Sequence, residues 1–163
     1  MSEEASPVKT NFTGKVEYEQ FVNEVIALAQ NELCIFDQLL GPAFNAPARH
    51  EALRQFLLSS RRNRLRIVLH DAASIDRSCP RMRELLANFN HAMAIHETQP
   101  QAKGIYDPFV VADESHSVRR FHFDNLRGLY ARNDPIEAHT LVGRFEEIWE
   151  ASTSAVVPTT IGL

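Results

Sequence analysis

Residues 65–71 read LRIVLHD, a short stretch dominated by large apolar side chains that ends in His70 and Asp71. Such a run, followed at once by polar residues, is typical of a strand buried inside a parallel sheet. Residues 33–38, LCIFDQ, show the same pattern. Between these two segments, residues 48–60 carry apolar side chains at helical spacing. The order strand, helix, strand indicates an α/β domain.

The remaining segments continue this alternation. We expect further helices over residues 18–31, 80–90 and 135–151, and further strands over 92–97, 107–113, 117–123 and 128–132. Pro80 and Pro135 stand where the first helical residue is expected, and Asp134 is placed to cap the last helix. We therefore predict a mixed, mostly parallel β-sheet with helices on both faces.

Length and composition limit the organisation of the chain. Its 163 residues, 44% of them apolar, suit one globular domain with a substantial core. We expect this domain to span residues 11–151, between a flexible N-terminal tail, 1–10, and a flexible C-terminal tail, 152–163. The formal net charge of −4 does not favour nucleic acid as a partner.

The sequence also suggests a cellular location. The first twelve residues are polar and acidic, and no run approaches the roughly 18 apolar residues that span a bilayer. Cys34 and Cys79 lie in unrelated contexts and form no disulfide framework. We therefore expect a cytoplasmic protein without a secretory signal or a membrane span.

Ligands of open α/β sheets bind beyond the carboxyl ends of the strands. Polar side chains follow the predicted strands at those ends: Asp37, Gln38, His70, Asp71, His96, Glu97 and Asp113. This set provides carboxylates and imidazoles, so we expect a polar ligand there.

No motif for nucleotide phosphates, zinc proteases or serine hydrolases occurs, since GxGxxG, GxxxxGK[ST], HExxH and GxSxG are all absent. His70 with Asp71 is typical either of a base and its partner or of residues that cap a neighbouring loop. His116 and His122 would share one face of a regular strand, but no carboxylate follows at a matching spacing. We predict neither a metal nor a cofactor.

The run RRNRLR, residues 61–66, contains four arginines. Arginine binds phosphate through two parallel N–H donors, which makes this run a candidate anion site. It also joins the end of a predicted helix to a strand, where cations favour the negative end of the helix dipole and stay solvated. Both interpretations remain open at this point.

One longer pattern goes further. The stretch IYDPFVVADES, residues 105–115, is followed by a β-rich segment, Asn133 and a terminal helix. This arrangement resembles the closing half of a phospholipase D superfamily domain. The stretch FVNEVIALAQNELCIFDQLL, residues 21–40, is similar to the opening half. The resemblance covers residues 12–151 and implies a phospholipase D-like single-half domain.

The catalytic signature of that family is a histidine, any residue, a lysine, four residues and an aspartate. With Asp113 as the aspartate, Tyr106 stands at the histidine position and Pro108 at the lysine position. In the family the histidine attacks phosphorus and the lysine stabilises the phosphate oxygens. Proline has no charge, and a phenol with its ordinary pKa near 10 is a poor nucleophile. The family's downstream Gly-Ser pair is absent, and Asn133 is the one counterpart there.

The resemblance therefore implies a degenerate domain, a pseudoenzyme that acts as a ligand-binding or regulatory module. Its expected ligand is a small anion or a phosphate-containing molecule. The candidate ligand-binding residues are Asp37, His70, Tyr106, Asp113, Arg120 and Asn133. Family members with one motif pair two identical subunits, so the resemblance also implies a homodimer.

The alternative is a phosphodiesterase or nuclease with a rearranged site. His70, His96 or His122 would then supply the nucleophile and Arg119 or Arg120 the cation, or Tyr106 would itself attack. The catalytic candidates for this alternative are His70, Tyr106, Asp113 and His122. The two hypotheses differ in whether a histidine and a cation converge beside Asp113.

Overall fold

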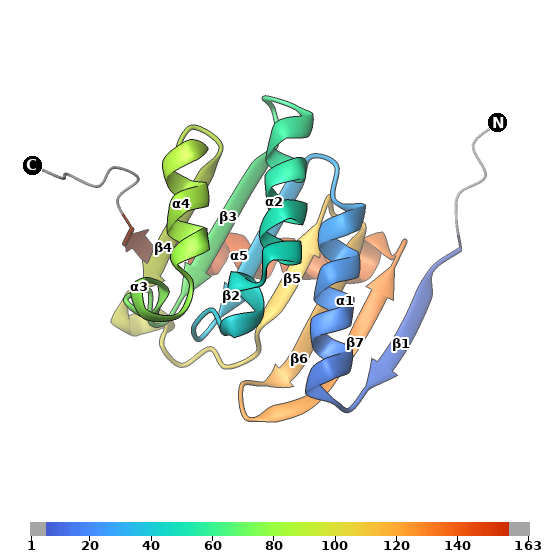
Figure 1. The fold of residues 1–163 in the computed structure, drawn as a ribbon. Coiled ribbons are helices and arrows are strands. Elements are labelled where there is room, and N and C mark those ends of the chain that lie inside the picture. The colour runs from blue at the N-terminus through green and yellow to red at the C-terminus, as the bar shows by residue number, and fades with distance from the viewer. Residues whose placement is uncertain (1–5, 157–163) are drawn as a thin grey trace, which may run out of the picture.

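Eight strands form one sheet in the order β1-β7-β6-β5-β2-β3-β4-β8 (Figure 1). The computed structural model describes residues 6–156. In chain order the elements are β1 Val8–Phe12, α1 Lys15–Leu28, β2 Glu32–Asp37, the 3₁₀ helix η1 Pro42–Asn45, α2 Pro47–Ser59, β3 Arg64–Leu69, α3 Ser74–Ser78, α4 Pro80–Asn88, β4 Met93–Thr98, the 3₁₀ helix η2 Pro100–Ala102, β5 Phe109–Ala112, β6 His116–His122, β7 Asn125–Arg132, α5 Pro135–Glu150 and β8 Ser152–Ser154. The predicted α/β class is confirmed.

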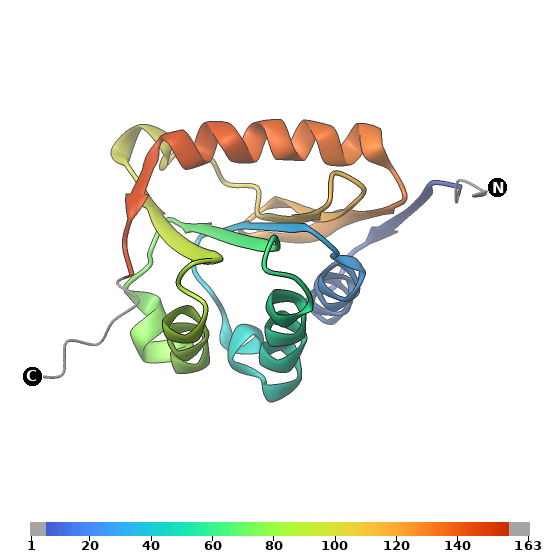
Figure 2. The ribbon, with the colours of Figure 1, turned by 90° about the horizontal axis from the view of Figure 1, so that it is seen from above.

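Helices cover both faces of the sheet, as predicted, but unequally. Figure 2 shows α5 alone on one face and the other four α-helices on the opposite face. Two apolar clusters follow from this division. The larger one packs α1, α2 and α4 against the sheet, and the smaller one joins Phe36, Phe109 and Phe145 beneath α5. Successive residues of the central strands pack alternately in the two clusters. Both faces of these strands are therefore apolar, which explains their continuous apolar sequence.

The predicted helix starts are found in the structure. The carboxylate of Asp134 accepts a hydrogen bond from the backbone N–H of Glu137 at 3.1 Å, and Pro135 is the first residue of α5. Pro80 likewise begins α4. Both prolines occupy a position whose backbone N–H has no helical partner, so their missing donor is not needed.

The sheet is mixed, as predicted, but the parallel part is small. Only β2, β3 and β4 run parallel within the described residues, whereas β5, β6 and β7 pair antiparallel with their neighbours. The short connections between β5, β6 and β7 explain this, because a hairpin can join only antiparallel strands. Because β5 runs antiparallel to β2, the residues before β5 lie near the carboxyl end of β2 and those after β5 lie near its amino end.

Parts of the segments expected as tails, 1–10 and 152–163, form strands. Val8 to Phe12 form the edge strand β1 on β7, and Ser152 to Ser154 form β8 on β4. Four of the five β1 residues are exposed, so the apolar pattern gives no signal for this strand. The rest of the predicted tails, 1–5 and 157–163, lies outside the described residues. No helix within 6–156 is long and apolar enough to cross a membrane.

Candidate functional site

A cavity of about 280 Å³ lies at the carboxyl end of β2, which we call the carboxyl-edge cavity. The first turn of α1, the end of β2 and the β6–β7 hairpin surround it. Its charged and aromatic lining consists of Lys15, Tyr18, Glu19, Asp37 and Arg120, with Leu39 and Leu126 at its rim. The predicted ligand-binding residues Asp37 and Arg120 are therefore brought together.

Sheet register explains this meeting. β2 ends at Asp37, and its alternate residues Leu33 and Ile35 pack in the cluster beneath α1. Asp37 continues this alternation and faces α1. On β6, Val118 belongs to the same cluster, and Arg120 follows it by two residues on the same face.

The carboxyl group of Asp37 is half-buried at the base of the cavity. Its Oδ1 accepts a hydrogen bond from the backbone N–H of Gln38 at 2.7 Å. Burial raises the pKa of Asp37 to about 7, although the Gln38 hydrogen bond and the Arg120 charge lower it. The group therefore changes charge near neutral pH, which an ordinary aspartate does not.

Arg120 is held over the ring of Tyr18, with its guanidinium carbon 5.0 Å from the ring centroid. This cation–π contact orients the side chain without neutralising it. Arg120 Nε is buried and has no hydrogen-bond partner within residues 6–156. Burial also raises the pKa of Tyr18, so the phenol stays neutral. Arg120 thus retains an unused donor.

The remaining charges leave the cavity with a surplus of positive charge. Glu19 forms an ion pair at 2.8 Å with the buried Arg49, so its charge is already balanced. Lys15 and Arg120 have no carboxylate within ion-pair distance in the described residues. With Asp37 neutral below about pH 7, the cavity presents two free cations.

His70 does not enter this cavity. Its ring packs against Phe36 and Phe123, on the α5 face of the sheet. The Nε2 atom lies 2.7 Å from the carbonyl oxygen of Ile105, and Nδ1 lies 2.6 Å from Oγ1 of Thr98. Since a carbonyl only accepts, Nε2 carries the proton and Nδ1 accepts from the threonine hydroxyl. Burial lowers the pKa of His70, and neither ring nitrogen has a free lone pair.

Tyr106 lies at the same edge of the sheet as Asp37, on the segment before β5. Its side chain is 50% exposed, and its ring packs 5.2 Å from that of His122. His122 Nδ1 accepts a hydrogen bond from the backbone N–H of Asp124 at 3.0 Å. The neutral imidazole therefore carries its proton on Nε2 and offers no lone pair for attack. Pro108, the other motif position, is buried.

Asp113 and Asn133 lie at the opposite end of the sheet, which corrects the prediction that all six candidates share one edge. In the antiparallel register, Phe109 pairs with Phe36 and Ala112 with Leu33. The carboxyl end of β5 therefore meets the amino end of β2. Asn133 follows β7, and its backbone N–H donates to His116 Nδ1 at 3.1 Å.

The other candidate histidines also lie outside the lining of the cavity. His96 stacks on Trp149 with ring centroids 3.6 Å apart, on the α5 face. His116 and His122 occupy the two ends of β6, separated by about 20 Å at the usual rise of a strand. No group of three histidine, cysteine or acidic side chains that could hold a metal ion is found among residues 6–156.

Sequence reasoning missed Lys15, Tyr18 and Glu19. The sequence predicts a helix over residues 18–31, whereas α1 begins at Lys15, and the apolar pattern gives no signal for its polar first turn. The available signal was topological: a helix that leads directly into a strand runs antiparallel to it, so its first turn lies at the strand's carboxyl end. The side chains of that turn were therefore candidates for the same edge as Asp37.

The fold is that of phospholipase D family members. Nuc from Salmonella typhimurium superposes with a TM-score of 0.63 and 14% identity, covering 93% of this chain and 100% of that one. NucT from Helicobacter pylori gives a TM-score of 0.57 and 11% identity over 92% and 100%. These similarities confirm the predicted fold.

A longer protein is also similar. TrmBL2, an archaeal chromatin protein whose structure shows a novel mode of DNA binding, gives a TM-score of 0.67 with 14% identity over 90% of this chain. The chain spans 54% of the length of TrmBL2. By sequence, the chain belongs to the family described as a domain of unknown function, DUF7931, which matches residues 15–156. None of the curated protein sequences compared with it matches.

Proposed function

We propose that this chain is a catalytically degenerate phospholipase D-like domain that binds a small phosphate-containing anion in the carboxyl-edge cavity and acts as a regulatory module. The observation that carries the proposal is the pair of free cations, Lys15 and Arg120, beside a carboxyl group that is neutral below about pH 7. The guanidinium and ammonium groups bind phosphate oxygens, and a protonated Asp37 donates a further hydrogen bond.

The loss of catalysis follows from the groups at the motif positions. Phosphodiester transfer through a covalent intermediate needs a free nucleophile and a fixed cation on the phosphate oxygens. Tyr106 and Pro108 stand at those positions. The three imidazoles proposed as substitutes, His70, His96 and His122, all have Nδ1 occupied by a hydrogen bond.

Hydrolysis of bis(p-nitrophenyl) phosphate tests the degenerate character. We expect no turnover by the wild-type protein, with or without a chelator. Turnover that survives chelator and disappears in Tyr106→Phe or His122→Ala would establish the alternative function, a phosphodiesterase with a rearranged site. Asp124→Ala serves as the matched control, since Asp124 is an exposed neighbour of His122.

Calorimetric titration with inorganic phosphate and glycerol phosphate tests the binding site. We expect Lys15→Ala and Arg120→Ala each to weaken binding by about tenfold. Arg127→Ala removes an exposed cation from the same β6–β7 hairpin region and should change affinity by less than about twofold. Equal losses in Arg120→Ala and Arg127→Ala would refute a specific site in the cavity.

We also propose that the protein is a homodimer that pairs through this edge. Leu39, Tyr106 and Leu126 are 39%, 50% and 42% exposed and place three large apolar side chains at this edge. A second copy would cover them. Sedimentation should give a dimer that Leu39→Asp with Leu126→Asp dissociates, whereas Ile136→Asp, at an exposed position on α5, leaves it intact.

A reducing compartment, and thus the cytoplasm, is supported by the two thiols. Cys34 and Cys79 are both free and buried. Burial raises the pKa of Cys34 to about 12, so it stays a protonated, unreactive thiol. Fractionation of the cells that produce the protein tests this assignment.

A further inference from the structure

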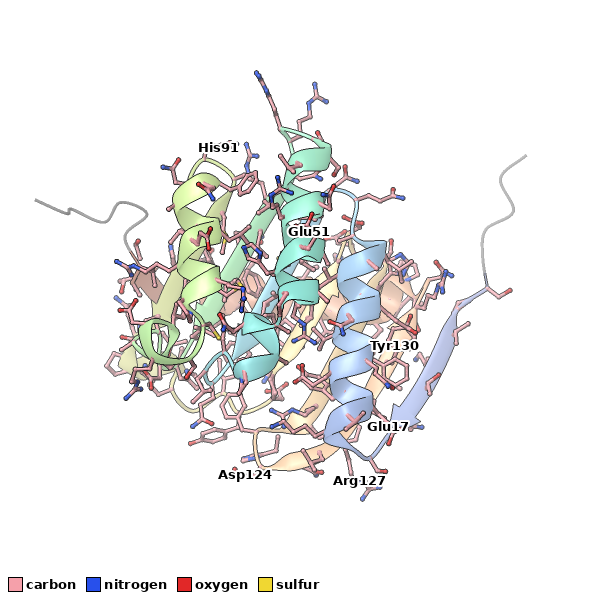
Figure 3. All side chains as sticks on the ribbon, in the orientation of Figure 1. Glu17, Glu51, His91, Asp124, Arg127 and Tyr130 are labelled. Carbon is pink, nitrogen blue, oxygen red and sulfur yellow. The ribbon has the colours of Figure 1, made fainter. Side chains whose placement is uncertain are left out.

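A second cavity, of about 480 Å³, lies at the other end of the sheet. We call it the amino-edge cavity, because the starts of β3 and β4 form its floor together with the last turns of α5. Figure 3 shows His91, one of its lining residues, at the end of the molecule opposite Asp124 and Arg127. It is therefore independent of the carboxyl-edge cavity, and the proposed function does not use it.

The arginine run of residues 61–66 reaches this cavity. Arg64 lines it and is exposed, and Arg61 and Arg62 are exposed on the preceding loop. None of the three has a carboxylate within ion-pair distance in residues 6–156. The Arg64 guanidinium nevertheless has a defined position, since its Nη1 donates to the carbonyl oxygens of Arg61 and Asn63 at 2.8 and 2.9 Å.

Arg66, the fourth arginine, has a different role. Its guanidinium pairs with both carboxylate oxygens of Glu146 and lies over the rings of Phe145 and Trp149 at 5.1 and 5.2 Å. Its charge is balanced, so it fixes the wall of the cavity. The run thus divides into one structural arginine and three free ones.

The other lining groups combine a few polar side chains at the mouth with apolar residues below them. Asn90 and His91 provide an amide and an imidazole at the mouth, and Glu32 is the one acidic side chain of the lining. Trp149 and Ala94, both partly exposed, provide apolar surface below them, while Leu65 and Met93 are buried beneath. The indole N–H of Trp149 makes no hydrogen bond within the described residues. A donor-rich rim with an apolar floor suits an anionic group joined to a flat ring.

We infer that the amino-edge cavity binds a nucleoside phosphate, with Arg64 and His91 on the phosphate and the ring against Trp149 and Ala94. The volume falls within the range of small-molecule sites. Arg64 is already oriented by two backbone carbonyls, so less side-chain freedom is lost on binding than for a mobile surface arginine. Arg61 and Arg62 add a positive field that attracts the anion.

Trp149 offers a direct measurement, because it is the only tryptophan of the chain. Its fluorescence, excited at the red edge of its absorption where nucleotides do not absorb, reports on this cavity and not on the carboxyl edge. We expect AMP to change the emission in a saturable way. Adenosine and inorganic phosphate, the two halves of the probe, should each bind at least about tenfold more weakly than AMP.

Paired charge reversals give the control. Arg64→Glu should weaken AMP binding by at least about tenfold, and His91→Ala by about threefold or more. Arg127→Glu makes the same change in net charge at the opposite end of the molecule and should leave the affinity within about twofold. Both arginines are exposed, so both variants are expected to fold.

Three results would overturn the inference. The first is the absence of a saturable fluorescence change with AMP. The second is an equal loss of affinity in Arg64→Glu and Arg127→Glu, which would mean attraction by net charge alone. The third is binding of adenosine as tight as that of AMP, which would exclude recognition of the phosphate. None of these outcomes bears on the carboxyl-edge cavity, whose test uses Lys15 and Arg120.

Discussion

The carboxylate of Asp113, at the end of β5, accepts a hydrogen bond from the backbone N–H of Asn31 at 2.8 Å, just before β2 begins. The same carboxylate accepts from the N–H groups of Gln30 and Glu32 at 2.7 and 2.8 Å. It therefore closes the α1–β2 turn onto β5. The single residue that matches the catalytic signature has a structural task at the end of the sheet opposite the carboxyl-edge cavity.

Replacing Asp113 tests this assignment. Asp113 has a φ of 57°, a conformation that asparagine also tolerates. Asp113→Asn should therefore keep the backbone conformation and alter only the side-chain group that accepts the three hydrogen bonds. One oxygen becomes an amide donor facing backbone N–H groups. We expect the free energy of unfolding to fall by about 2–3 kcal/mol in urea titrations. Asp124→Asn, at a fully exposed carboxylate, should change it by less than about 0.5 kcal/mol. Equal stabilities of the two variants would contradict the assignment.

Gly128 should be irreplaceable because β1 packs across it. A Cβ atom at this position of β7 would lie 2.1 Å from the carbonyl oxygen of Arg119 and 2.4 Å from Cζ of Phe12. We expect Gly128→Ala to displace β1 and to lower the free energy of unfolding by about 3 kcal/mol or more. Hydrogen exchange should show β1 amides losing protection first.

Gly143 provides the opposite control. It lies in α5 and a Cβ there would meet nothing within 4 Å. Gly143→Ala should therefore raise the free energy of unfolding by about 0.5–1 kcal/mol, since alanine loses less backbone freedom in a helix. A loss of stability in Gly143→Ala would show that α5 does not have the described exposure.

The alternation of helices and buried strands could be predicted from the sequence because each parallel strand is covered on both faces. Residues 33–38, 65–71 and 92–97 read as apolar runs for that reason and correspond to β2, β3 and β4. Pro80, Asp134 and Pro135 marked helix starts through local backbone chemistry. These signals depend only on residues that are close in the sequence, so they can be recognised before the fold is known.

The ends of the sheet could not be assigned in the same way. The apolar pattern of β5 is the same whichever way the strand runs, so the sequence does not show its direction. Because β5 runs antiparallel to β2, Asp113 lies at the opposite end of the sheet from Asp37. The strand β1 is held by backbone hydrogen bonds to β7, which have no side-chain pattern. The cavity residues Lys15 and Glu19 reach Asp37 through the packing of α1, a relationship between segments that are distant in the sequence.

Arg49 links the stability of the domain to the charge of the carboxyl-edge cavity. It is 4% exposed, lies over the Phe44 ring at 4.5 Å and pairs with Glu19. We expect Arg49→Met to preserve much of the packing but to free the charge of Glu19. Phosphate binding measured by calorimetry should then weaken by about threefold or more. Arg54→Met, on the exposed side of the same helix, should leave the affinity unchanged.

Asp37 should make stability depend on pH in the direction opposite to an ordinary aspartate. Its pKa is about 7 in the folded protein, well above its ordinary value near 3.9, because burial opposes the charged form. Between these two values the folded state holds a proton that the unfolded state has released. The free energy of unfolding therefore falls as pH rises from about 4 to about 7, and the loss persists above that range.

Asp37→Asn removes this dependence, since the amide oxygen still accepts from the Gln38 N–H and carries no charge. We expect wild type and variant to have similar stability near pH 4, where Asp37 holds its proton in the folded state and the unfolded-state carboxyl is only beginning to ionise. At pH 8 the variant should be more stable, by at most about 4 kcal/mol, because it avoids burying a carboxylate. Glu19 raises and Arg120 lowers the pKa of Asp37, so the measured difference reports on their balance. Urea titrations at both pH values, with Asp124→Asn as the exposed control, measure it. A variant that is no more stable than wild type at pH 8 would mean that Lys15 and Arg120 keep Asp37 ionised, and the cavity would then lose its surplus of positive charge.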